Sequence, residues 1–230
     1  MEYLEFERIL SVKRMQRYKD AVNGDTRKAM ALYRYNLRLS QEMFTIVSCF
    51  EVALRNAIDN LLVPTLGEDW LKDSVQDNGM FSNGRMNETR KIIEKAYNRL
   101  NRQGIYSHSK LIAEMEFGVW KYMYSSLQYR ATGQCLLRAF PNKPRSSAAI
   151  QYNNTYIFNE LDKVNSLRNR IAHHEPICFR LHASEIDTSY IVNEYQKIQT
   201  LFSWMGIDSR SMLYGLDHVQ SVCSKINALK

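Results

Sequence analysis

Apolar side chains recur every three or four residues from about Arg27 to Leu62, and this spacing limits the fold more than any other feature. The positions are Leu32, Tyr35, Leu39, Met43, Ile46, Phe50, Ala53, Leu54, Ala57, Ile58 and Leu61. Such spacing, sustained over many turns, predicts one long amphipathic helix. Pro64 predicts its end, because proline cannot donate the helical hydrogen bond.

The rest of the chain shows the same helical spacing and no alternating run long enough to predict a strand. We expect further helices at about residues 4–18, 87–101, 109–127, 155–174, 184–205 and 209–228. The predicted fold class is therefore all-α, a helical bundle with long core helices and extra flanking helices.

The length of 230 residues allows one good core without disulfides or a structural metal. We expect a single domain over residues 1–230 that begins with an N-terminal helical segment at 1–22. Two prolines, Pro141 and Pro144, stand among polar residues and predict a loop insertion at about 141–152.

The formal net charge of +7 is concentrated in one part of the chain. Between Arg90 and Arg145 there are eleven Lys or Arg and only three acids, so this basic segment carries +8. A localised basic surface is typical of nucleic-acid binding. A solvated charged face is the more common explanation of such a segment, and both interpretations stay open.

Composition argues against several classes of protein. Hydrophobic residues at 45% and charged residues at 24% fit a globular protein. The four cysteines are far apart and form no C-x-x-C pair, so no zinc or redox motif is indicated, and we expect buried free thiols.

The acidic N-terminus predicts no signal peptide, and the apolar run 43–50 is too short for a membrane span. We expect a cytoplasmic protein that needs no cofactor.

One segment, Leu167 to Pro176, combines groups that suit chemistry on a phosphodiester. Arg168 is a planar fork of hydrogen-bond donors that binds phosphate, and the amide of Asn169 follows it. His173 is the side chain type best suited to moving protons near neutral pH. Pro176 predicts that the helix ends near His174.

The spacing within this segment limits how its side chains can meet. Arg168 and His173 are five residues apart, so on a continuous helix they point about 140° apart. Asn169 and His173 are four apart and share a face. Two geometries bring Arg168 and His173 to one phosphate: the helix unwinds at His173, or two copies of the helix meet across a dimer axis.

Structural interpretations of the same residues also exist. Arg168 and Arg170 are then solvated helix charges, and His173 and His174 cap the C-terminal carbonyls of the helix. A metal site ranks below both alternatives, because adjacent histidines point apart on a helix and no second ligand cluster is evident.

Three segments together resemble a known family. Residues 168–173 are similar to the R-N-x-x-x-H signature of HEPN-superfamily ribonucleases, and His174-Glu175-Pro176 continues it as in the Abi-like (abortive infection) family. Residues 50–56 resemble the first conserved helix of that family. Residues 116–120 resemble its central Phe-Gly-x-Trp element, and the three segments occur in the family's order.

The resemblance implies a HEPN-like helical fold, usually a homodimer in which two R-x-x-x-x-H motifs face each other. It implies a metal-independent RNA endonuclease of the toxin type, which acts in antiviral defence through attack of a ribose 2′-hydroxyl on the adjacent phosphate. Arg168 then binds phosphate, Asn169 orients the reacting groups, and His173 is the catalytic histidine. RNA is the implied partner, with a small non-coding RNA or an antitoxin as a further one.

Further RNA contacts are expected at Arg55, Asn56, Arg170, His174 and the basic segment 90–145. For Arg55 the slightly preferred alternative is an ion pair with Asp59, four residues on. Phe117 and Trp120 are expected in the core.

Two other functions compete with the nuclease. One is a non-catalytic RNA-binding module that holds a small RNA. The other, less favoured, is a protein-interaction scaffold whose basic segment contacts an acidic partner.

Overall fold

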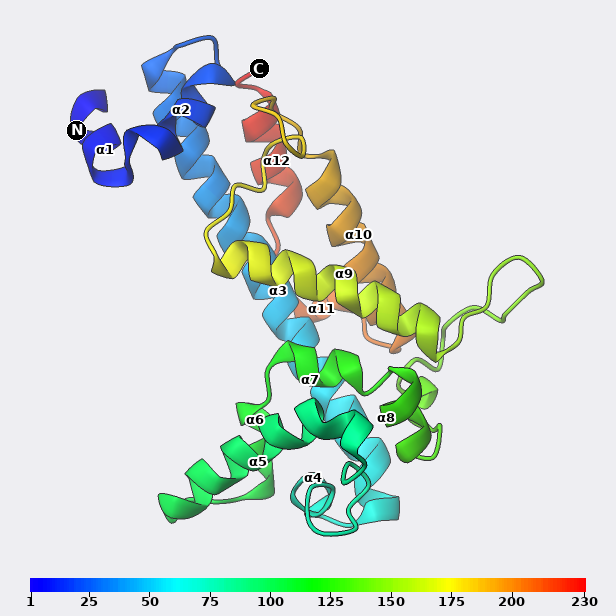
Figure 1. Cartoon of the computed structure of the whole chain (residues 1–230). Helices are drawn as coiled ribbons and strands as arrows, with labels where there is room; N and C mark the ends of the chain where they lie inside the picture. The colour runs from blue at the N-terminus through cyan, green and yellow to red at the C-terminus, as the bar shows by residue number, and fades with distance from the viewer. The chain divides into compact units, whose positions relative to one another are not determined.

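The computed structural model describes all 230 residues and confirms the all-α fold class (Figure 1). The α-helices are α1 (Tyr3–Leu10), α2 (Val12–Asp20), α3 (Thr26–Leu66), α4 (Trp70–Asp73), α5 (Asn87–Arg102), α6 (His108–Glu114), α7 (Phe117–Tyr122), α8 (Ser126–Ala131), α9 (Asn154–Ala172), α10 (Ser189–Trp204), α11 (Ser209–Met212) and α12 (Val219–Asn227). Two short 3₁₀ helices are η1 (Gly84–Met86) and η2 (Leu136–Ala139). The only β pairing is an isolated bridge between Phe179 and Ile186.

The residues divide into two compact units. Unit 1 comprises residues 1–48, 166–200 and 208–230, and unit 2 comprises 49–165 and 201–207. The boundary between them falls inside α3, α9 and α10. The expectation of a single domain over residues 1–230 stays a prediction.

Unit 1 has a core of aliphatic side chains and aromatic rings. The ring of Tyr18 on α2 meets the rings of Tyr33 and Phe179 edge-on, with centroids 5.1 and 5.0 Å apart. Edge-to-face contacts of this kind are worth about 0.5–1.5 kcal/mol beyond the burial of their area. Other buried members are Met15, Leu32, Leu39, Met43, Ile46, Leu167, Ile171, Ile177, Ile191, Ile198, Val219 and Ile226.

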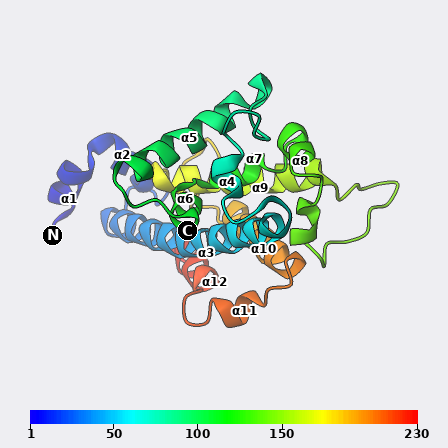
Figure 2. The same cartoon turned by 90° about the horizontal axis from the view of Figure 1, so that it is seen from below.

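Unit 2 has its own core around Phe50 of α3. Its ring contacts Phe202 at 5.3 Å and Phe117 at 6.3 Å between centroids. Phe117 and Trp120 are fully buried, which confirms the expectation that they are core residues. Helices α4, α5 and α6 pack together in this unit (Figure 2).

The long helix was predicted correctly except for its end. α3 continues through Pro64 to Leu66 and stops at Gly67, which has a φ of 92°. The expectation that Pro64 ends the helix is wrong. Pro64 and Asn60 are both exposed, so solvent can bond the Asn60 carbonyl that receives no hydrogen bond from the proline.

The N-terminal segment contains two helices where the spacing predicted one over 4–18. Ser11 separates α1 from α2 with a φ of 79°, a positive value that a right-handed helix cannot contain. Its hydroxyl accepts a hydrogen bond from the backbone N–H of Arg14 at 3.3 Å and so caps α2.

Three other predicted helices are shorter or broken. The one at 109–127 divides into α6, α7 and α8, because Met115 and Glu116 are extended between the first two and Ser125 is extended before the third. The one at 209–228 divides into α11 and α12, with Gly215 at a φ of 74° between them. The one at 184–205 starts only at Ser189, whose backbone N–H donates to the Asp187 carboxylate.

The loop predicted at about 141–152 is present, and no helix occurs between Ala139 and Asn154. It extends away from the N-terminal end of α9 (Figure 1). α9 itself covers most of the predicted helix 155–174.

Candidate functional site

The Arg168–His173 motif forms the last turn of α9, in unit 1. Leu167 and Ile171 are buried, as the apolar stripe predicted, which fixes the rotation of the helix. Asn169 and His173 are exposed and Arg168 is partly exposed. All three polar side chains of the motif therefore reach solvent.

The helix ends in a double hydrogen-bonded turn around His174. The Glu175 N–H donates to the Arg170 carbonyl at 2.9 Å, and the His174 N–H donates to the Ile171 carbonyl at 3.0 Å. His174 has a φ of 55°, in the left-handed region that glycine usually occupies at this position. This pattern is a Schellman motif, and His173 is its C-cap residue, directly after Ala172.

The helical hydrogen bonds continue as far as the amide of His173, which donates to the Asn169 carbonyl at 2.9 Å. Asn169 and His173 therefore share a face, as the spacing predicted. The structure does not contain the first of the two expected geometries, in which the chain unwinds to bring His173 round to Arg168. The Schellman turn reverses the chain only after His173, so the helix remains regular up to that point.

The side chains of Arg168, Asn169 and His173 make no hydrogen bond or ion pair within the chain. A bound phosphate can therefore take the donors of Arg168 without displacing a protein carboxylate. The His173 ring also has no hydrogen-bond partner within the chain, and it stands at the C-terminal end of α9. Together these groups can bind an anion and transfer a proton.

Neighbouring side chains hold the turn in place. The Arg170 guanidinium donates to the Glu175 carboxylate at 3.2 Å and to the Pro176 carbonyl at 3.0 Å, and it lies 5.0 Å from the Tyr190 ring centroid. The His174 carbonyl accepts a hydrogen bond from Arg14 of α2 at 3.1 Å. The RNA contacts expected of Arg170 and His174 stay predictions.

Two further residues hold the chain segment that follows α9, and neither was predicted from the sequence. The Asn36 side-chain oxygen, buried on α3, accepts the backbone N–H of Ile177 at 2.9 Å. Arg17 on α2 donates twice to the Ala183 carbonyl and stacks over the Phe179 ring at 4.6 Å. A signal existed for Asn36, since it lies four residues after Leu32 and three before Leu39 on the apolar stripe.

Comparison with known families identifies the family. The family model described as Abi-like protein matches residues 3–178. The chain belongs to the Abi-like family. No curated protein and no solved structure matches it. The matched range includes the whole Arg168–Pro176 segment of this Abi-like protein.

In unit 2 of the Abi-like protein, α3 carries Arg55 and Asn56. Asn56 is exposed, and the Nε of the partly buried Arg55 has no hydrogen-bond partner. The expected ion pair between Arg55 and Asp59 is wrong. Asp59 instead accepts Trp70 Nε1 at 2.7 Å and bonds His108 Nε2 at 2.8 Å, so its carboxylate turns to α4 and α6. RNA contacts of Arg55 and Asn56 stay predictions.

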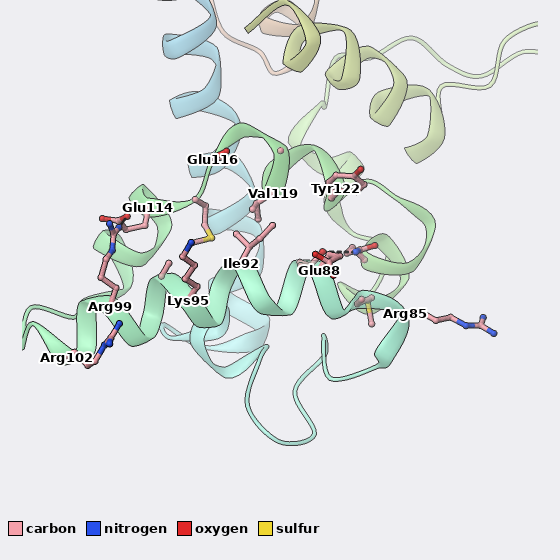
Figure 3. Close-up of a pocket in the computed structure, with 16 residues that line it drawn as sticks. Arg85, Glu88, Ile92, Lys95, Arg99, Arg102, Glu114, Glu116, Val119 and Tyr122 are labelled. Atoms are coloured by element: carbon pink, nitrogen blue, oxygen red, sulfur yellow. Dashed lines mark hydrogen bonds and ion pairs between the residues drawn. The ribbon is translucent and has the colours of Figure 1, made fainter. Parts of the chain in front are cut away.

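Part of the basic segment lines a cavity of about 780 Å³ formed by α5, α6 and α7. Figure 3 shows Lys95, Arg99 and Arg102 along α5, with Glu114 near the Arg99 guanidinium. Arg99 and Glu114 form an ion pair. The acids Glu88, Glu114 and Glu116 also line this cavity, so carboxylates offset much of its positive charge (Figure 3).

No group of three or more His, Cys, Asp or Glu side chains is placed to hold a metal ion. All four cysteines of the Abi-like protein are free thiols, and Cys178 and Cys223 are buried. Cys49 and Cys135 are partly exposed, so the expectation of burial holds for only two of the four. None of the helices combines the length and apolar character that a membrane span requires.

Proposed function

We propose that this Abi-like protein is a metal-independent RNA endonuclease that acts in abortive infection, as a toxin-type defence against phage in the cytoplasm. The observation that supports this most is the free and solvent-accessible set of Arg168, Asn169 and His173 at the end of α9. This set lies inside the range that matches the Abi-like family. The resemblance to HEPN ribonucleases supplies the reaction.

In the proposed reaction, a ribose 2′-hydroxyl attacks the adjacent phosphorus and the 5′-oxygen of the next nucleotide leaves. Arg168 binds the non-bridging phosphate oxygens and stabilises the charge that they gain in the transition state. His173 exchanges a proton with the reacting oxygens, and Asn169 orients the reacting groups. The products carry a 2′,3′-cyclic phosphate and a 5′-hydroxyl.

The geometry of α9 supports the proposal of a homodimer. The helix stays regular up to His173, so Arg168 and His173 of one chain point about 140° apart. A second copy can supply the missing partner to each phosphate. We therefore propose a composite site in which the Arg168 of one chain acts with the His173 of another.

The test is cleavage of end-labelled single-stranded RNA by the purified full chain in the presence of EDTA. Arg168→Ala and His173→Ala should each lower the rate by ~10²–10⁴, the usual cost of losing an acid, base or charge-stabilising group. Arg27→Ala and His182→Ala are matched controls, because both side chains are exposed and lie outside the motif. Cleavage that survives both motif substitutions would show that the site is elsewhere.

The non-catalytic RNA-binding module remains the second candidate, since several cations of the basic segment have no carboxylate partner. It predicts that the same assay finds RNA bound with salt-sensitive affinity and uncut at any protein concentration. A small non-coding RNA or an antitoxin is the further partner that we propose, as an inhibitor of the nuclease.

A further inference from the structure

The chain between Glu116 and Glu160 contains no acidic residue. Its cations are Lys121, Arg130, Arg138, Lys143 and Arg145. Lys121 pairs with Asp162 at 2.8 Å, whereas the other four form no ion pair. Cations without a carboxylate partner keep their full attraction for phosphate.

An aromatic cluster lies in the same unit. The rings of Tyr152, Tyr156 and Trp204 contact one another, with centroids 4.8, 5.6 and 6.1 Å apart. All three residues are partly exposed, in contrast to Trp70 and Trp120, which are 1% and 0% exposed. The cluster therefore offers aromatic surface to solvent, as a base-stacking site requires.

The loop at residues 141–152, which carries Lys143 and Arg145, is anchored to this aromatic cluster at both ends. The backbone N–H of Asn142 donates to the Trp204 carbonyl at 2.9 Å, and the Asn142 side chain donates to the Ser203 carbonyl at 3.3 Å. The loop ends at Tyr152, itself a member of the cluster. Lys143 and Arg145 lie between these two anchors in the sequence, so the anchors limit how far their charges can move from the rings.

We propose that the aromatic cluster, together with Lys143 and Arg145, binds unpaired nucleotides of single-stranded RNA. Bases stack on the rings while the two cations contact the flanking phosphates. The cavity along α5 is less suited to RNA, because Glu88, Glu114 and Glu116 line it and repel phosphate. The proposal rests on the proposed function for its choice of RNA, and it adds a set of RNA-binding residues that are not part of the Arg168–His173 motif.

The test measures binding of a short labelled oligouridine to the full chain carrying His173→Ala, which keeps the RNA intact. Tyr156→Ala should weaken binding roughly tenfold, as loss of one stacked base does, and Tyr156→Phe should keep the affinity. Lys143→Gln combined with Arg145→Gln should reduce the salt slope by about 1.4, or ~0.7 for each lost phosphate contact. Tyr214→Ala is the matched control, because Tyr214 is 89% exposed in unit 1.

A second measurement separates stacking from a merely structural role of the rings. Trp204 is the one partly exposed tryptophan, so bound RNA should quench its fluorescence. Trp204→Phe should remove the quenching and keep the binding, since phenylalanine still offers a ring.

Any one of three results would overturn the proposal. They are an unchanged affinity in Tyr156→Ala, an unchanged salt slope in the double variant, and saturation with RNA without quenching of the fluorescence. A protein that binds RNA in this way and never cleaves it would refute the nuclease and leave this binding site standing. If the protein cleaves RNA and all these variants bind RNA with unchanged affinity, the nuclease stands and this binding site is refuted.

Discussion

At the scale of single residues, the backbone conformation of His174 determines where α9 ends, and the candidate site ends there too. A side chain with a β-carbon in the left-handed region costs about 1–2 kcal/mol, and the Schellman hydrogen bonds hold His174 there. The turn in consequence leaves His173 as the C-cap residue directly after α9, with its side chain in solvent.

Replacing His174 by glycine should stabilise the fold by about 0.5–1 kcal/mol, because glycine adopts this φ without strain. Urea unfolding followed by circular dichroism measures the change. Ala172→Gly is the control on the same helix end, and it should destabilise by about 0.5–1 kcal/mol, since Ala172 is helical and exposed. A destabilising His174→Gly would contradict this account of the turn.

The residues of the motif could be predicted from the sequence, but the left-handed turn could not. The usual signal for such a turn is glycine or asparagine, and here a histidine occupies it. Ser11 is a similar case, because serine in a left-handed conformation between two helices carries no clear sequence signal. The His174 carbonyl accepts a long-range hydrogen bond from Arg14, whereas the hydrogen bonds of Ser11 are local to α2.

At the scale of elements, one buried amide joins α3 to the segment that follows the motif. Asn36→Ala should destabilise by ~1–3 kcal/mol, because it leaves the buried N–H of Ile177 without its acceptor. Asn36→Asp retains an acceptor oxygen and should recover part of the loss. Asn56→Ala, an exposed site on the same helix, is the control and should stay within about 0.5 kcal/mol of the parent in chemical denaturation. Equal effects at both positions would refute the proposed role of Asn36.

The periodic pattern predicted α3, α5 and α9 closely, since each buries apolar side chains at helical spacing along one face. It failed where two consecutive residues are extended, as at Met115 and Glu116, because Met115 and Phe117 are then both buried. The break at Gly215 did carry a sequence signal, a glycine within an apolar pattern, which the helical spacing outweighed.

At the scale of the whole molecule, burial of phenols and thiols links stability to alkaline pH. Burial raises the pKa of Cys178 to about 12. Burial, with hydrogen bonds to Glu7 and Asp217 respectively, also raises the pKa of Tyr3 and Tyr195 to about 12. In the unfolded chain these groups lose their protons near their ordinary pKa values of 9 to 10.

The folded state therefore binds more protons than the unfolded state between about pH 9 and 12, and stability falls as pH rises through that window. The melting temperature should be steady from about pH 7 to 9 and then decrease continuously. Thermal melts by circular dichroism at increasing pH measure it. A melting temperature that stays constant up to about pH 11 would contradict the assigned burial.

The all-α fold class could be predicted from the sequence, whereas the division into two units could not. Helical spacing shows which face of a helix is buried and does not show which other helix covers it. The same limit applies to the site, since the spacing of Arg168 and His173 allows a site shared between two copies without requiring one.

The most direct test of the composite site mixes two inactive variants. Arg168→Ala and His173→Ala are co-refolded or co-expressed, so that mixed dimers form, and RNA cleavage is compared with that of each variant alone. We expect each variant alone to be inactive. The mixture should recover a substantial part of the parental activity, because the mixed dimer contains one intact Arg168–His173 pair. Mixed dimers that stay as inactive as the separate variants would contradict it.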